Sequence, residues 1–158
     1  MNKPCQVRGF TLLEVLMVMV IIGAVLSMVT LVVPASPARQ ARVEAQRLAQ
    51  LVQAARESAV LEGREYGLRF APDEYLLLRL KEDGWYTQGA PHRLPEGMRL
   101  QLRQAGLAVQ LRKQGGAPQL LALSSDEYSA FEVSFDHHGQ HLLRLAGDGL
   151  GEPLIHED

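Results

Sequence analysis

The hydrophobic and polar positions divide the chain into three stretches with different periods. In the first stretch, residues 10–33, about 24 positions are nearly all apolar. A helix needs roughly 20 such residues to cross the hydrocarbon core of a bilayer, so the pattern predicts a membrane-spanning helix. Glu14 is the one charged residue within it. Because a charge at that depth costs roughly 2.5–3.5 kcal/mol on insertion scales, we expect Glu14 to have a function and a partner.

The second stretch has the period of an amphipathic helix. Pro34 and Pro37 come first, and because proline disfavours helical geometry in the preceding residue, we expect a kink or a short break over 33–38. Over 38–61, small and apolar residues recur at spacings of three and four, which predicts a helix that lays one stripe on a sheet. Gly63 is expected to end this helix, because glycine is favoured just after a helix C-terminus. The stripe consists of Ala41, Ala45, Leu48, Val52, Ala55 and Ala59, and the polar positions outside it are Arg42, Glu44, Arg47, Gln50, Gln53 and Glu57.

In the third stretch, after Gly63, the period falls to two, which is typical of strands. Residues 71–74 and 81–84 are turn-like, so the first three strands are expected to form a meander. Residues 89–97 are expected to be a loop. Helices followed only by strands predict an α+β fold, with antiparallel sheets packed on the amphipathic helix. The predicted strands are 65–70, 75–80, 85–87, 98–103, 107–112, 119–123, 131–135 and 141–146.

Length and charge limit the classes of function. With 158 residues and 47% hydrophobic content, the chain has room for one membrane helix and one modest soluble domain. Lys3 and Arg8 precede the apolar run, so loss of residues 1–9 would change the formal charge from -2 to -4. A mildly acidic protein is a poor candidate for binding DNA or other polyanions. Cys5 is the sequence's single cysteine, so a chain without residues 1–9 would form no disulfide.

Three histidines, His137, His138 and His141, are the most obvious candidate metal ligands. Adjacent residues on a strand point to opposite faces, which would separate His137 from His138, although a turn there would bring them together. Neither a cysteine nor a well-spaced set of carboxylates completes a site. We therefore expect a solvated hairpin, with no metal and no other cofactor.

Two other short motifs are better explained by turns than by catalysis. Ser124, Ser125 and Asp126 suggest a nucleophile, but no Gly-x-Ser-x-Gly elbow surrounds them, so turn chemistry is expected. The glycines of 147–151 do not match the spacing of a dinucleotide-binding loop and are expected to allow positive φ in a final loop. The sequence thus contains no constellation for an anchored enzyme.

Residues 8–14, Arg-Gly-Phe-Thr-Leu-Leu-Glu, resemble the start of type IV pilin-like precursors. In that family the leader ends in glycine, the mature chain begins with phenylalanine, and its fifth residue is glutamate; here these are Gly9, Phe10 and Glu14. A secretory signal peptide fits less well, because its apolar region is normally 7–15 residues long and ends at a small-residue cleavage site. A plain single-span anchor fits the length of the apolar run but leaves Glu14 unexplained.

This resemblance implies how the precursor is processed and where it resides. A prepilin peptidase of the inner membrane would cut between Gly9 and Phe10 and methylate the new amino group of Phe10. Glu14 would then pair with the Phe10 amine of a neighbouring subunit during assembly. Residues 1–9 would be a cytoplasmic leader, 10–33 a single membrane span, and 34–62 and 63–158 the periplasmic helix and β-rich domain of a Gram-negative envelope protein.

The rest of the chain narrows the resemblance to the H-type minor pseudopilins of type II secretion systems. It rests on the run 55–70, with smaller matches at 83–85, at 94–97, at Ser124 and Ser125 with Phe131, and at 147–151. A FimT-like minor type IV pilin, acting in pilus assembly or DNA uptake, is the alternative. DNA capture would need a basic groove or tail, whereas residues 152–158 are acidic.

The H-type resemblance implies a pilin-like fold and a structural role without catalysis. The expected partners are prepilin peptidase, the major pseudopilin, the other minor pseudopilins and inner-membrane lipid before assembly, with no nucleic acid. The subunit would lie near the tip of a pseudopilus that helps to export folded proteins across the outer membrane.

Overall fold

The computed structural model describes residues 11–27, 36–113 and 115–157, and the chain divides into two compact units between Pro34 and Ala35. The first unit contains helix α1, Leu12–Ser27, which begins where the N–H of Glu14 donates to the carbonyl of Thr11 at 3.0 Å. The prediction of one helix over 10–33 extends beyond the described residues at both ends. Within the described ranges, no helix combines the length and apolar character needed to span a membrane.

The second unit begins with helix α2, Pro37–Glu62, as the amphipathic pattern predicted. The hydroxyl of Ser36 accepts from the N–H of Arg39 at 3.3 Å and caps the first turn, while Pro37 occupies a position where a missing N–H costs little. Gly63 adopts φ 60° and donates its N–H to Ala59, which confirms the predicted stop. Of the kink expected over 33–38, only the start of α2 lies within the described residues.

Five strands form the first antiparallel sheet, in the order β3-β2-β1-β7 with β4 also beside β2. The predicted meander of β1, β2 and β3 is confirmed. The expectation that 89–97 is wholly a loop was wrong, because β4 lies within it; a strand of two residues is too short to produce a visible period. The strands are β1 Tyr66–Phe70, β2 Glu74–Lys81, β3 Gly84–Thr87, β4 His92–Arg93 and β7 Leu120–Ala122.

The second sheet has the order β10-β9-β8-β5-β6 and is also antiparallel. Burial alternates along β5 as its sequence predicted. The prediction for 107–112 was too long, since β6 ends at Val109, and β10 was not predicted at all. It pairs with β9, the preceding strand, with Ile155 opposite Leu145, and its three residues are too few to show a period in the sequence. The strands are β5 Met98–Gln104, β6 Leu107–Val109, β8 Phe131–His137, β9 Gln140–Gly147 and β10 Leu154–His156.

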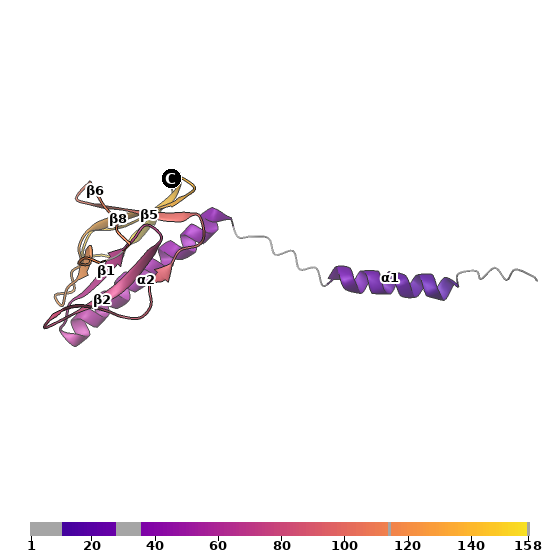
Figure 1. Ribbon diagram of the computed structural model, residues 1–158, viewed down its shortest axis with the longest axis horizontal. Helices are drawn as coiled ribbons and strands as arrows, with labels where there is room; N and C mark the ends of the chain where they lie inside the picture. The colour runs from indigo at the N-terminus through magenta and orange to yellow at the C-terminus, as the bar shows by residue number, and fades with distance from the viewer. Residues whose placement is uncertain (1–10, 28–35, 114, 158) are drawn as a thin grey trace, which may run out of the picture. The chain divides into compact units, whose positions relative to one another are not determined.

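One core joins α2 to the inner faces of both sheets (Figure 1), which confirms the predicted α+β class. The alanines of α2 are small enough to let the strands approach the helix closely. Every buried apolar residue in the described chain lies between Ala41 and Leu145, so this core belongs to the second unit alone. Among its largest completely buried side chains are Tyr75, Phe70, Phe135, Leu48, Leu68, Met98, Leu102, Leu120, Leu143 and Leu145.

Gly67 in β1 allows a close approach of the segment before β7. A Cβ atom at this position would lie 2.5 Å from both Cβ and Cγ of Pro118. The neighbouring Gln119 holds the same segment in place, because its side-chain carbonyl accepts from the N–H of Phe70 at 2.8 Å. The glycine therefore lets the proline pack directly on the backbone of β1.

A buried arginine, Arg56, ties α2 to the end of the chain. Its guanidinium donates to the carbonyls of Asp126 at 2.9 Å and Gly151 at 3.2 Å, and pairs with the Asp126 carboxylate at 3.2 Å. It lies 5.1 Å above the ring of Tyr128, whose hydroxyl donates to the same Gly151 carbonyl at 2.8 Å. Burial raises the pKa of Tyr128, which keeps this hydroxyl protonated as a donor. We call Arg56, Asp126, Tyr128 and Gly151 the Arg56 cluster.

Replacing Gly67 by alanine should destabilise the protein, because the new methyl group overlaps Pro118. Overpacking of this kind costs about 1–3 kcal/mol in the free energy of unfolding, measurable by urea denaturation. Gly151→Ala is a matched control, since a Cβ there meets only the Asp148 carboxylate at 3.6 Å or more. Equal stability of the two variants would contradict the close approach at Gly67.

Arg56→Met should lower the free energy of unfolding by about 3 kcal/mol, because it removes charged hydrogen bonds to two carbonyls in a buried site. Tyr128→Phe removes one hydrogen bond and should cost about 1 kcal/mol. Arg64→Met serves as the control, since Arg64 is exposed and surface substitutions usually stay within about 0.5 kcal/mol. Denaturant titrations of the three variants measure these differences; an Arg56→Met variant as stable as the control would refute the role of the cluster.

Candidate functional site

Of the residues predicted to carry processing and assembly, Glu14 lies in the described part of the chain, whereas Gly9 and Phe10 lie outside it. Glu14 occupies the first turn of α1, where a carboxylate interacts favourably with the helix dipole. Its side chain is exposed in the isolated chain. An exposed carboxylate at this position is sterically free to meet a cation from another molecule.

A second acidic residue, Glu44, was expected on the polar side of α2, and that prediction was wrong. Its side chain is 8% exposed, and its carboxylate contacts Nη1 of Arg47 at 3.1 Å and Nε2 of His92 at 2.6 Å. The short contact assigns Nε2 of His92 as a hydrogen-bond donor. The ring of His92 also packs on Tyr75, with centroids 4.8 Å apart. Glu44 is therefore buried because two basic groups compensate its charge.

Tyr75 lies near Glu44 and has a buried hydroxyl group without a hydrogen-bond partner among the described protein atoms. Burial raises the pKa of Tyr75, and the nearby Glu44 carboxylate raises it further. A tyrosine held neutral in this way is a packing residue that offers no acid or base near neutral pH.

The three candidate metal ligands are divided between two places. His137 ends β8 and His138 follows in the turn with φ 49°, so their rings lie 4.3 Å apart at an interplanar angle of 77°. His141, on β9, instead contacts the Asp136 carboxylate through Nδ1 at 3.1 Å. No group of three or more His, Cys, Asp or Glu side chains that could hold a metal ion occurs within residues 11–27, 36–113 and 115–157.

The turn predicted at Ser124, Ser125 and Asp126 is confirmed. The N–H of Asp126 donates to the carbonyl of Leu123 at 3.1 Å, and Asp126 adopts φ 69°. The Ser125 hydroxyl contacts the Glu127 carboxylate at 3.5 Å, a longer distance than an activating hydrogen bond to a base requires. The turn thereby places the carbonyl and carboxylate of Asp126 against Arg56.

The prediction for the glycines of 147–151 needs correction. Gly149 alone among them has positive φ, at 100°. Gly147 is required for space instead, because a Cβ there would lie 2.5 Å from the Tyr128 hydroxyl and 2.9 Å from the Phe131 ring. Asp148 accepts from the N–H groups of Leu150 and Gly151 at 3.0 and 2.8 Å, and these bonds lower the pKa of its carboxyl.

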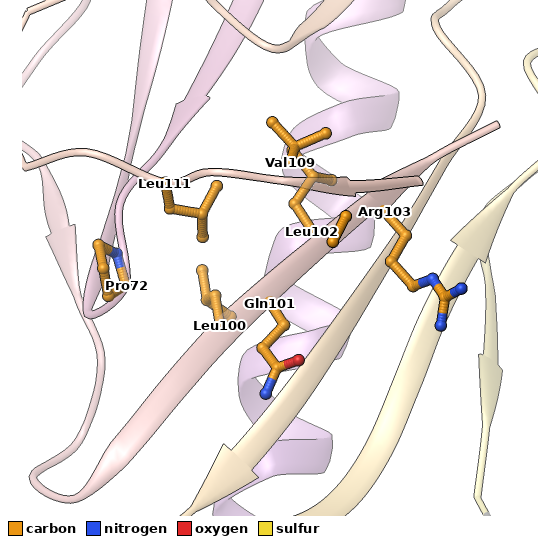
Figure 2. Close-up of a pocket in the computed structure, with 8 residues that line it drawn as sticks. Pro72, Leu100, Gln101, Leu102, Arg103, Val109 and Leu111 are labelled. Carbon is orange, nitrogen blue, oxygen red and sulfur yellow. The ribbon is translucent and has the colours of Figure 1, made fainter. Parts of the chain in front are cut away.

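A cavity of about 420 Å³ lies along β5 and β6. Figure 2 shows that Leu100, Leu111 and Pro72 meet there from three segments of the chain. Gln101 and Arg103 form its polar edge, and Arg103 is held by a bond to the Gly106 carbonyl at 2.9 Å. The lining contains no histidine and no carboxylate, and its side chains are otherwise apolar.

Comparison with known proteins matches both parts of the chain. Residues 5–30 match the prokaryotic N-terminal methylation motif, and residues 44–151 match the family of type II transport protein GspH. The type II secretion system protein H of Pseudomonas aeruginosa is 37% identical over 163 aligned residues that cover 94% of this chain and 95% of the relative. The protein H of Vibrio cholerae is 32% identical over 84% of each chain.

A solved structure agrees with these relatives. The minor pseudopilin EpsH from the type 2 secretion system of Vibrio cholerae superposes with a TM-score of 0.65 and 25% identity, covering 75% of this chain and 96% of that one. The relatives are H proteins of type II secretion, so the FimT-like alternative is not favoured. The methylation motif includes Gly9, Phe10 and Glu14, and the GspH match includes the whole Arg56 cluster. The chain therefore belongs to the GspH family of type II secretion minor pseudopilins.

Proposed function

We propose that this chain is a structural, non-enzymatic subunit of the type II secretion pseudopilus. The observation that carries the proposal is the N-terminal methylation motif at residues 5–30, followed in the same chain by a GspH match at 44–151. The subunit lies near the tip of the filament, between the other minor pseudopilins and the major one. Growth of the filament then helps to move folded proteins across the outer membrane.

Processing converts the precursor into an assembly-competent subunit. Prepilin peptidase cuts between Gly9 and Phe10 and methylates the new amino group of Phe10. The cut removes Lys3 and Arg8, which mark the leader as cytoplasmic in the precursor. Residues 10–33 then anchor the chain in the inner membrane, with 34–62 and 63–158 in the periplasm.

Glu14 provides the electrostatic step of assembly. A carboxylate among apolar helices is strongly destabilised unless a cation compensates it. The amino group of Phe10 on a neighbouring subunit is such a cation, and pairing with it also fixes the register of one helix against the next. The exposed side chain of Glu14 in the first turn of α1 is consistent with a partner supplied by another subunit.

The division of the chain into two units supports transfer from lipid into a filament. All buried apolar residues of the described chain lie between Ala41 and Leu145, and every α1 side chain that the structure describes is exposed. The second unit therefore builds its core from its own residues. The periplasmic unit can stay folded while the N-terminal segment exchanges lipid for neighbouring helices.

Gly9→Ala should block cleavage by a co-expressed prepilin peptidase, because a side chain at the last leader position obstructs the scissile bond. Intact-mass and N-terminal analysis should show the wild type without nine residues and with a methyl group on Phe10, and the variant at full length. Gly23→Ala is the control, since it changes a glycine of the same segment away from the cut. A wild type that remains full length, or is cut beyond residue 33, would refute the proposed pathway.

Glu14→Gln should still be cleaved but should assemble poorly, because a neutral amide cannot compensate the Phe10 amine. We expect the fraction of subunit recovered in sheared pseudopili to fall at least about tenfold, which corresponds to about 1.4 kcal/mol of lost pairing energy. Thr11→Ala, three positions earlier, is the control. Normal incorporation of a cleaved Glu14→Gln subunit would show that this carboxylate has no role in assembly.

A further inference from the structure

The turn between β8 and β9 places two histidines together, although neighbouring strand residues should point apart. His138 adopts φ 49°, outside the strand region, and this reverses the direction of its side chain relative to a continued strand. As a result the His137 and His138 rings lie 4.3 Å apart, nearly perpendicular to one another. The N–H of His138 donates to the Gly97 carbonyl at 3.1 Å, and this hydrogen bond holds the turn in place.

The same nitrogen of both rings faces Gly97. A Cβ on this glycine would lie 2.8 Å from Nε2 of His138 and 3.0 Å from Nε2 of His137. Both Nε2 atoms thus lie close to a single point beside the glycine, which has no side chain to separate them. Glycine also suits the backbone there, because φ is +80°.

We propose that His137 and His138 form a binding site for a divalent transition-metal ion through their Nε2 atoms. Imidazole nitrogen is a preferred ligand of copper, zinc and nickel, which take it at about 2.0–2.1 Å in the case of zinc. The ring torsion of histidine is soft, and His138 is exposed, so both nitrogens can turn toward one ion beside Gly97. Water completes the coordination.

Neighbouring groups define which ions the site accepts. His141 contacts the Asp136 carboxylate through Nδ1 at 3.1 Å, and the proposed site consists of His137 and His138 alone. Asp136 is also bonded to the side chain of Gln101 and is buried, so it is already satisfied. Calcium and magnesium prefer several oxygen ligands, and this pair of nitrogens does not provide them. Among first-row divalent ions the site should favour Cu²⁺, in accord with the usual order of affinities.

A bound ion would hold the β8–β9 turn in a single arrangement, because both of its protein ligands belong to that turn. His138 and Gly97 are already connected by one backbone hydrogen bond. Metal binding to the folded form alone stabilises it by mass action. The two protein ligands predict an affinity below that of closed sites with four protein ligands.

Titration of the full chain with Cu²⁺ in detergent micelles, followed by electron paramagnetic resonance, tests this site. The samples carry no histidine tag, and all carry Cys5→Ser so that no thiol competes. We expect one bound Cu²⁺ with hyperfine coupling to two imidazole nitrogens. His137→Gln and His138→Gln each remove one of the two protein ligands. Each should lower the affinity at least about tenfold, because the loss of a residue that only orients a ligand already costs that much.

Two control substitutions distinguish binding at this site from non-specific binding of Cu²⁺ to other histidines. His141→Gln and His156→Gln each remove one imidazole from the same sheet and should leave the affinity within about twofold. A wild-type spectrum with fewer than two coupled nitrogens would overturn the proposal, and this readout needs no variant to fold. Affinity unchanged in both His137→Gln and His138→Gln would overturn it as well, as would an equal loss in His141→Gln.

Discussion

The burial of one stripe of α2 against two sheets is the constraint on which the rest of the fold depends. Ala41, Ala45 and Ala59 are completely buried, and their small side chains bring the strands close to the helix axis. Leu48 and Val52 fill the centre of the same interface. Both antiparallel sheets have an apolar inner face that must be covered, and the α2 stripe covers part of each.

Two buried charged residues of α2 then fix how the outer segments attach. Arg56 binds the carbonyls of Asp126 and Gly151, whereas Glu44 binds His92 on β4. Removing a charge from water is costly unless well-placed partners replace the water. Each buried charge is therefore stable only when its partner segments lie in a particular position.

The proposed function uses a folded unit whose buried apolar residues all lie between Ala41 and Leu145 in the described chain. Filament assembly requires an apolar helix that leaves lipid, and a folded unit that does not change when this happens. The described α1 side chains are exposed and contribute nothing to the core. In the proposed assembly step, Glu14 would meet an amine of a neighbouring subunit in a low dielectric, where opposite charges attract most strongly.

Local period and local motifs were enough to predict the α2 stripe, the helix end at Gly63, the alternation of β5 and the N-terminal motif that contains Gly9, Phe10 and Glu14, because each of these involves neighbouring residues only. Tertiary structure decided what depends on distant partners. The burial of Glu44 and Arg56 and the approach of Pro118 to Gly67 require residues tens of positions away. The short strands β4 and β10 form because β2 and β9 provide an edge to pair with. The paired rings of His137 and His138 likewise depend on a left-handed residue in the turn and on a glycine about 40 positions earlier, because only that packing brings the two nitrogens together.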